Sequence, residues 1–329
     1  MAPRPELCNC EYGPSASRRA TCCRYSVIIC THNRGELLER CLQAVIREVK
    51  RACVLGEIVV IDNASTDSTR ERVERLLREA EDGPAIRYAF VPAPNLCLAR
   101  NRGIALAEGE ILIFLDDDAF PVGGWLTSCL DAFEKFPTAC ALGGEVRPLL
   151  QTSSPPWFRP PLSGLYTITD LGGADIRVFP RRRHPVGANM AFRRHVFDRW
   201  RFSTQLGRSG AGLMSGDEAE LFAAVGRSGG KVLYVPAMAV DHLIHSDRLT
   251  EKWVRRRFFF DGVSRARMQL ALGARIVAFI RMAGLALLLL PLWPLARTPF
   301  RRLVWQCSFL KCVGYFGQLA RVARFTPWF

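Results

Sequence analysis

Three adjacent carboxylates, Asp116, Asp117 and Asp118, directly follow an apolar run at 111–115 and are the side chains best suited to chemistry in this chain. Like charges this close repel one another, so at the end of a buried strand they are costly unless a cation offsets them. Carboxylate oxygens without sulfur ligands favour Mg²⁺ or Mn²⁺, which keep positions open for phosphate oxygens. The triplet therefore predicts a divalent-metal site for a phosphorylated substrate, and the alternative is a solvated acidic turn.

Polar side chains follow two further apolar runs in the same way. Asp62 comes directly after EIVVI, and Thr31-His32-Asn33-Arg34 comes after YSVIIC. Asp is also an ordinary helix-capping residue. Because ligands bind at the carboxyl ends of strands in open α/β sheets, the three strand ends together would form one pocket.

The elements that would position these residues are short apolar runs alternating with amphipathic stretches. This alternation predicts an α/β fold with a mostly parallel central sheet and helices on both faces. The predicted strands lie at 25–30, 57–61, 86–91, 110–115, 139–146, 187–192 and 231–235. The predicted helices lie at 35–50, 65–79, 96–107, 122–136, 216–228 and 250–272. No G-x-G-x-x-G follows the first strand, which counts against an ordinary dinucleotide-binding dehydrogenase.

Taken in order, the motifs of the chain resemble those of the inverting family 2 glycosyltransferases. They are YSVIICTHNR, IVVIDNASTD, ARNRGIALAEGEILIFLDDDA, GANMAFRR and SGDEAEL. The resemblance implies the GT-A fold over 25–272, with a Rossmann-like nucleotide-sugar half at 25–147 and an acceptor half at 148–272. It also implies a metal-dependent enzyme that moves a sugar from a nucleoside diphosphate sugar to an acceptor hydroxyl, in cell-surface polysaccharide or glycolipid synthesis.

The resemblance also implies roles for individual residues. Those expected to bind the nucleotide sugar are Thr31, Asn33, Arg34, Asp62, Arg100, Asn101, Asp116 and Asp117. The expected ligands of Mg²⁺ or Mn²⁺ are Asp118 first, then Asp116 and His242. The cation would offset the charge that develops on the departing diphosphate.

The expected general base lies in an acidic pair at a predicted helix start. The family usually has Glu-Asp there, whereas this chain has the reverse order, Asp217-Glu218. Alignment by position makes Glu218 the expected base and leaves Asp217 as the alternative. Carboxylates are favoured at a helix start by the helix dipole in any case. The reversed order also leaves open a noncatalytic sugar-nucleotide-binding module.

The end of the chain is basic and apolar. Lys and Arg outnumber Asp and Glu by 45 to 31, and the segment 263–329 holds ten basic residues and no acidic one. Its apolar core at 282–296 contains two prolines and is shorter than the roughly 20 residues of a spanning helix. We expect 273–329 to form helices that associate with an anionic membrane surface, at the cytoplasmic face, which suits a sugar or lipid-linked acceptor. The alternative is a helical pair packed on the catalytic domain.

The first residues, 1–24, are expected to be a disordered tail. They hold four cysteines at a spacing unlike that of zinc sites and no apolar segment of a signal peptide, so the catalytic part is expected in the cytosol.

Two other functions also match part of the sequence. A haloacid-dehalogenase-like phosphatase or phosphotransferase also ends a buried strand with Asp-x-Asp, but its nucleophile strand normally opens the fold, and here three predicted strands come first. Nucleic-acid binding is suggested by the net charge of +14 alone. The basic residues at the end of the chain cluster beside an apolar run instead of on an aromatic-interleaved polar face, so no nucleic-acid partner is expected.

Overall fold

A computed structural model describes most of the chain. The described residues are 24–79, 84–180, 183–206, 213–271, 282–284, 286 and 296–319. The expected N-terminal tail therefore lies outside the described residues except for Arg24, and so does most of the apolar core at 282–296.

The chain divides into two compact units. The first contains the chain up to Arg147, Thr169–Phe202 and Leu221–His242, and the second contains Pro148–Ile168, Ser203–Glu220 and the chain from Leu243 onward.

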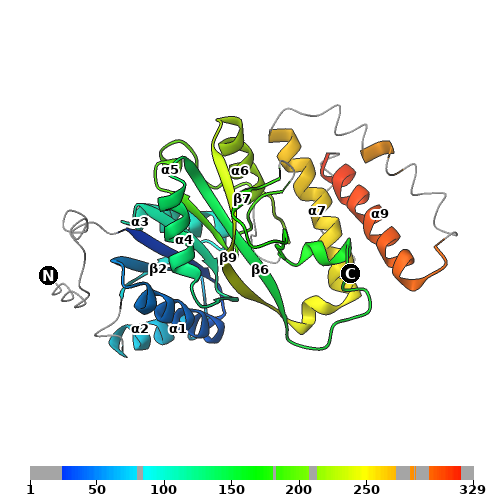
Figure 1. Ribbon diagram of the computed structural model, residues 1–329. Coiled ribbons are helices and arrows are strands. Elements are labelled where there is room, and N and C mark those ends of the chain that lie inside the picture. Colours follow the sequence, from blue (N-terminus) through cyan, green and yellow to red (C-terminus); the bar gives the residue numbers. More distant parts are fainter. Residues whose placement is uncertain are drawn as a thin grey trace. The chain divides into compact units, whose positions relative to one another are not determined.

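The first unit is built on a mixed β-sheet (Figure 1). Its parallel half has the order β3 (Ala85–Val91), β2 (Gly56–Asn63), β1 (Tyr25–Thr31) and β4 (Ile111–Asp116). The order continues with β8 (Met190–Arg193), β6 (Ala139–Leu150), β9 (Lys231–Ile244) and β5 (Ala119–Pro121), and β7 (Arg177–Val178) pairs with β9. Since β8 pairs antiparallel with both β4 and β6, and β9 with both β5 and β7, the prediction of a mostly parallel sheet holds for only the first half.

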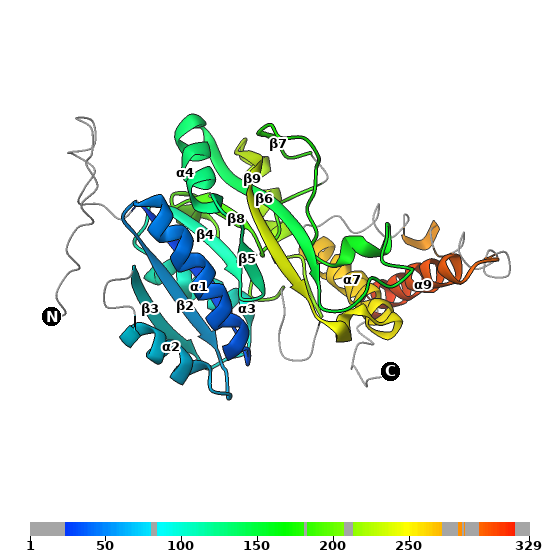
Figure 2. The same ribbon diagram turned by 60° about the horizontal axis from the view of Figure 1, so that its bottom comes forward.

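Helices cover both faces of this sheet, as the α/β prediction requires (Figure 2). One face packs against α1 (Gly35–Ala52), α2 (Thr69–Glu79) and α4 (Trp125–Lys135). The other packs against α3 (Leu96–Leu106), α5 (Val196–Arg199) and the part of α6 (Asp217–Arg227) from Leu221 onward.

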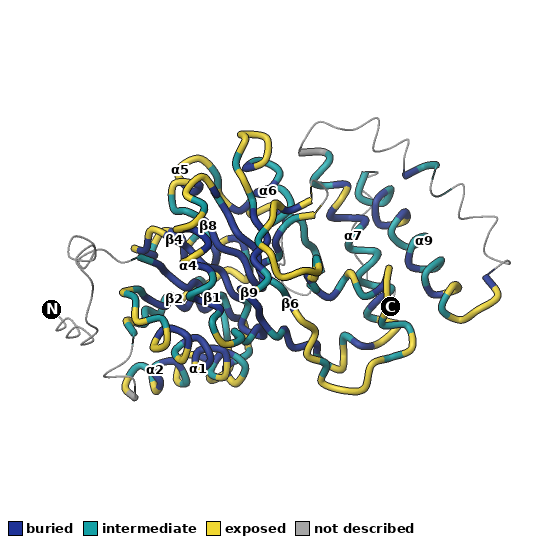
Figure 3. The backbone as a smooth tube through the Cα atoms, in the orientation of Figure 1, coloured by how far each residue is buried: buried dark blue, intermediate teal, exposed yellow. Residues whose placement is uncertain are grey.

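Successive residues of β1 alternate between these two packed layers. Val27 and Ile29 belong to the α1 layer, whereas Ile28 belongs to the α3 layer. The strands are buried on both faces, as the dark central strands in Figure 3 show, and for this reason they read as continuous apolar runs in the sequence.

Among the boundaries that differ from the sequence prediction, three have a clear physical reason. Helix α2 begins at Thr69, not at residue 65, because the backbone N–H groups of Ser65 and Thr66 donate to the side chains of Asp62 and Asn33, at 2.8 and 2.7 Å. Helix α4 begins at 125, not at 122, because the Val122 N–H donates to the Ala239 carbonyl at 3.0 Å and Gly124 has a left-handed φ of 89°. Strand β9 extends to residue 244 instead of 235, since β5 supplies a partner for its second half.

The second unit contains a pair of long helices, α7 (Glu251–Ala271) and α9 (Pro299–Leu319), and two short 3₁₀ turns, η1 (Leu162–Leu165) and η2 (Ser246–Leu249). The long helices lie side by side in Figures 1 and 2. Glycines let their backbones approach closely, since an added Cβ would lie 2.0 Å from the Lys311 carbonyl oxygen at Gly262 and 2.1 Å from that of Phe259 at Gly314.

Polar side chains also join the two helices. The Arg255 Nε donates to Gln306 Oε1 at 2.9 Å, and the Tyr315 hydroxyl donates to Gln269 Oε1 at 2.7 Å. Helix α9 thus packs against α7 as one half of a helical pair. Among the helices in the described part of the chain, none has both the length and the hydropathy needed to cross a bilayer.

Candidate active site

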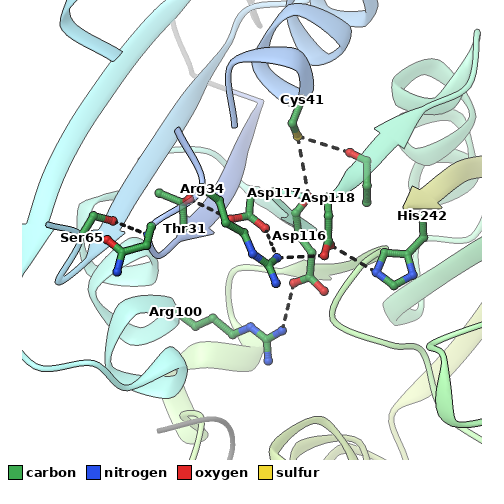
Figure 4. A network of polar contacts seen from close by, with 11 residues as sticks. Thr31, Arg34, Cys41, Ser65, Arg100, Asp116, Asp117, Asp118 and His242 are labelled. Atoms are coloured by element: carbon green, nitrogen blue, oxygen red, sulfur yellow. Dashed lines mark hydrogen bonds and ion pairs between the residues drawn. The ribbon is translucent and has the colours of Figure 1, made fainter. Parts of the chain in front are cut away.

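The acidic triplet lies at the turn between β4 and β5, and its side chains point in different directions (Figure 4). Asp118 is 2% exposed, and its Oδ1 lies 3.2 Å from Nε2 of His242. Asp116 has a side chain that is 32% exposed, and its Oδ1 lies 3.6 Å from Nη2 of Arg100. One candidate ligand atom from each of Asp116, Asp118 and His242 lies within 4.8 Å of the other two.

The pairing of β5 with β9 places His242 in this group. In the antiparallel register Ala119, which directly follows the triplet, is the partner of His242. Because directly paired residues in a sheet lie side by side, this register brings the imidazole next to Asp118. The sequence put His242 beyond the end of a strand, whereas it lies within one.

These three residues fit a divalent cation. Two carboxylates and one imidazole are a common set of donors for such ions. His242 is 3% exposed, and its Nδ1 has no hydrogen-bond partner among the described residues. With its proton on Nε2 the imidazole donates to Oδ1 of Asp118, and with its proton on Nδ1 the lone pair of Nε2 is free to bind a cation that Asp118 also holds.

Asp117 is directed away from His242, toward the end of β1. Its Oδ2 accepts a hydrogen bond from the Thr31 hydroxyl at 2.7 Å, and its Oδ1 accepts one from Nη1 of Arg34 at 2.8 Å. The same Arg34 nitrogen donates to Oδ2 of Asp118 at 2.9 Å. Burial raises the pKa of Asp117 to about 6, while the positive charge of Arg34 acts in the opposite direction. Thr31, Arg34 and Asp117 therefore lie with the candidate metal ligands, and the Asp117 carboxylate bonds to protein groups.

Helix α3 places Arg100 in the candidate site. The Asn95 side chain caps the helix by accepting from the N–H groups of Cys97 and Leu98, at 2.9 and 3.1 Å. Gly103 lets α3 pack tightly on β1, since an added Cβ would lie 2.5 Å from Cγ2 of Ile28. Arg100 is only 2% exposed, which places its guanidinium in the interior beside Asp116.

Asn101, which is predicted to face the donor, hydrogen-bonds to the backbone of Phe202. Its Nδ2 donates to the Phe202 carbonyl at 2.8 Å, and its Oδ1 accepts from the Phe202 N–H at 3.0 Å. The Phe202 ring lies 5.2 Å from the Arg100 guanidinium. The amide of Asn101 therefore fixes the backbone that follows α5.

Hydrogen bonds of Asp62 and Asn33 hold the loops that follow β2 and β1. Asp62 is 1% exposed, and its two oxygens accept from the Ser65 N–H at 2.8 Å and the Tyr88 hydroxyl at 2.7 Å. Asn33 has a φ of 52°, a left-handed conformation that Asn tolerates better than most residues, and its backbone N–H donates to Ser65 Oγ at 2.9 Å.

Two contributors to the site were missed in the sequence. Tyr88 lies on β3, where a polar aromatic residue in an edge strand was the only signal. Cys41 lies on α1 and donates from its thiol to the Ala119 carbonyl at 3.3 Å, beside the acidic turn (Figure 4). Its position among apolar helix residues gave no signal of this contact.

The acidic pair expected to hold the base opens α6. Asp217 is the first residue of the helix and is 2% exposed, whereas Glu218 is half-buried. Both belong to the second unit.

Fold and site together define an α/β enzyme with a candidate metal cluster at the carboxyl edge of its sheet. Residues 26–201, more than half of the chain, match the model of the family described as "Glycosyl transferase family 2". The chain belongs to this family and is a glycosyltransferase. Membership excludes the haloacid-dehalogenase-like alternative.

Curated relatives span most of the chain. The succinoglycan biosynthesis protein ExoM of Rhizobium meliloti (strain 1021) is 29% identical over 262 residues, which cover 78% of this chain and 79% of that protein. The glucosyl-dolichyl phosphate glucuronosyltransferase of Haloferax volcanii is 25% identical over 255 residues, covering 75% and 78%.

Solved structures share the fold. The mannosyltransferase PcManGT from Pyrobaculum calidifontis, in complex with GDP-Man and Mn²⁺, has a TM-score of 0.58 at 20% identity, covering 90% of this chain and 87% of that one. The structure of GalNAc-T7 with UDP, GalNAc and Mn²⁺ has a TM-score of 0.54 at 20% identity and covers 75% of this chain, which spans about half, 51%, of that protein. The GT-A fold predicted from the motifs is therefore confirmed.

Proposed function

We propose that this glycosyltransferase moves a sugar from a nucleoside diphosphate sugar to an acceptor hydroxyl with inversion, and that it depends on Mn²⁺. One observation carries the proposal, namely that candidate ligand atoms of Asp116, Asp118 and His242 lie within 4.8 Å of one another beside the ends of the parallel strands. Ligands bind at this edge in open α/β sheets.

The donor set and the local charge support a divalent cation. When bound, the ion would offset negative charge on the departing diphosphate. The three carboxylates of the triplet carry three negative charges against the two positive charges of Arg34 and Arg100, so the group attracts a cation. The imidazole of His242 favours Mn²⁺ over Mg²⁺, because Mg²⁺ binds chiefly oxygen.

We assign the general base to Glu218. Its half-buried side chain is more accessible to an acceptor than that of Asp217, which is 2% exposed at the helix start. The Glu218 carboxylate takes the proton of the acceptor hydroxyl while the hydroxyl oxygen attacks the anomeric carbon. The bond from that carbon to the diphosphate breaks, and the electron pair leaves with the diphosphate. A single displacement of this kind inverts the anomeric carbon.

The proposed acceptor is a saccharide or lipid-linked saccharide at the cytoplasmic face of a membrane, in polysaccharide or glycolipid synthesis. The names of the two curated relatives, one for succinoglycan biosynthesis and one for a glucosyl-dolichyl phosphate, support this class. The exposed Arg301 and Arg302 of α9, within a segment free of acidic residues, would attract anionic lipid.

Vesicle binding tests the membrane proposal. The full chain is expected to sediment with phosphatidylglycerol vesicles at low salt and less at high salt. Reversing the charge with Arg301→Glu and Arg302→Glu should weaken sedimentation, whereas Arg47→Glu and Arg201→Glu, at exposed arginines of the first unit, should not. Equal sedimentation of both double variants would contradict it.

Titration calorimetry of donor binding and an assay of donor hydrolysis test the proposed transfer reaction. We expect one of the UDP-, GDP- or dTDP-sugars to bind the full chain only with Mn²⁺, and slow Mn²⁺-dependent hydrolysis of that donor. Asp118→Asn should abolish metal-dependent binding, whereas Asp131→Asn, at an exposed residue of α4, should not. Failure of every sugar nucleotide to bind with Mn²⁺ would overturn the proposal.

A further inference from the structure

A continuous series of polar contacts runs from β1 to β9 through the acidic triplet (Figure 4). The Thr31 hydroxyl and Arg34 Nη1 both donate to Asp117, at 2.7 and 2.8 Å. The same Arg34 nitrogen donates to Oδ2 of Asp118 at 2.9 Å, and Oδ1 of Asp118 lies 3.2 Å from His242 Nε2. The two oxygens of Asp118 are thus divided, one toward Arg34 and one toward the candidate metal position.

Asp117 lies in the interior, as Asp118 does. Asp117 and its partner Thr31 are 4% and 2% exposed, so little of this carboxylate is accessible to a nucleotide. The side chain of Arg34 is 29% exposed and is long and rotatable, so it needs a fixed partner to keep one position. Asp117 is such a partner, because Thr31 holds it from the other side.

We propose that Asp117 is a positioning residue for the metal site, which acts through Arg34 to fix the carboxylate of Asp118, and that it does not contact the donor. This inference rests on the proposed metal-dependent function. Because Arg34 pairs with both Asp117 and Asp118, its guanidinium neutralises only part of the charge of Asp118. Asp118 then stays oriented with Oδ1 toward His242.

Removing the charge of Asp117 changes this balance. In Asp117→Asn the amide can replace one of the two hydrogen bonds but not the ionic partner of Arg34. The guanidinium then pairs with Asp118 alone and competes with the cation for it. Changes to groups that orient metal ligands typically cost 10- to 100-fold in metal affinity, and we expect a loss of about this size.

Binding of Mn²⁺ alone to the full chain, followed by electron paramagnetic resonance without nucleotide, tests the proposal. We expect Asp117→Asn to weaken Mn²⁺ binding by roughly 10- to 100-fold, and saturating Mn²⁺ to restore its kcat. Thr31→Val, which removes the hydroxyl, should weaken Mn²⁺ binding less, and Thr31→Ser, which keeps it, should bind like the wild type. Asp131→Asn, at an exposed carboxylate, is the matched control.

Two results would overturn the inference: Mn²⁺ affinity unchanged in a folded Asp117→Asn, or donor binding at saturating Mn²⁺ weakened by the same substitution. If thermal melting shows that Asp117→Asn does not fold, the Mn²⁺ affinity of Thr31→Val is the test instead. An affinity of Thr31→Val equal to that of the wild type would then overturn the inference. A wild type that binds no Mn²⁺ defeats the proposed function as a whole, whereas a wild type and Asp117→Asn that bind Mn²⁺ equally defeat this inference alone.

Discussion

The imidazole of His242 lies with its Nε2 3.2 Å from Oδ1 of Asp118, although the two residues belong to distant parts of the chain. The antiparallel pairing of β5 and β9 creates this contact, because Ala119 and His242 are direct partners in the register. The candidate metal cluster thus depends on the same pairing that extends β9 beyond its predicted end.

Removing this imidazole should weaken the metal site. We expect His242→Ala to lower Mn²⁺ affinity by at least tenfold, because one of the three clustered ligand groups is lost. Mn²⁺ titration followed by paramagnetic resonance measures this effect. His195→Ala, at an exposed histidine before α5, is the control, and equal Mn²⁺ affinity of the two variants would count against His242 as a ligand.

Replacing the proposed base should separate turnover from donor binding. Glu218→Gln keeps the shape of the side chain but cannot take a proton, so we expect kcat to fall by roughly 10²- to 10⁴-fold with little change in the donor KM. Steady-state kinetics with the identified donor measures both. Glu220→Gln, in the same helical turn, is the control. A larger loss of kcat in Asp217→Asn than in Glu218→Gln would move the assignment to Asp217.

Changing Asn101 should affect stability more than donor binding. Its amide bonds to both polar groups of Phe202, at 2.8 and 3.0 Å, so Asn101→Ala should lower the free energy of unfolding by about 1–3 kcal/mol. Asn101→Asp should also destabilise, because a carboxylate cannot donate to the Phe202 carbonyl. Denaturant unfolding measures the loss of stability, and steady-state kinetics measures the donor KM. If Asn101 contacted the donor, the substitution would raise KM without a comparable loss of stability.

The glycines between α7 and α9 should not tolerate a side chain. A Cβ at Gly262 would lie 2.0 Å from a backbone oxygen of α9, so Gly262→Ala should destabilise by about 1–3 kcal/mol. Gly317→Ala on α9 is the matched control, because nothing lies within 4 Å of its added Cβ and Ala favours a helix by up to about 1 kcal/mol. Thermal unfolding that gave both variants the same shift would contradict the close packing.

Stability of the same helical pair should depend on pH through Asp261. Burial alone would raise the pKa of Asp261, but Lys311 at 2.5 Å and Arg265 at 3.1 Å outweigh it, so the pKa lies below its ordinary value. A lowered folded-state pKa contributes stability above the unfolded value of about 3.9, and this is lost as pH falls through the folded value. Urea unfolding should show Asp261→Asn less stable than the wild type at pH 7, with the gap shrinking below about pH 4. A gap that does not change with pH would refute this.

The sequence by itself determined the elements of the nucleotide-sugar half. The apolar runs of β1, β2 and β4 and the helical spacing of α1 are local patterns, readable because each strand is buried on both faces and the helix on one. The family motifs also located the acidic triplet and His242 in advance.

Only the tertiary structure decided which partners the side chains of these residues contact. The pairing of β5 with β9 is set by contacts between distant segments, so neither the extension of β9 nor the neighbours of His242 could be read from local periodicity. For the same reason the sequence could not tell that Asn101 would hold Phe202, or that Asp117 would turn toward Thr31 while its neighbour Asp118 turns toward His242. Residue type and spacing fix which element forms, whereas the partner of a buried polar side chain depends on which strands and helices the fold brings beside it.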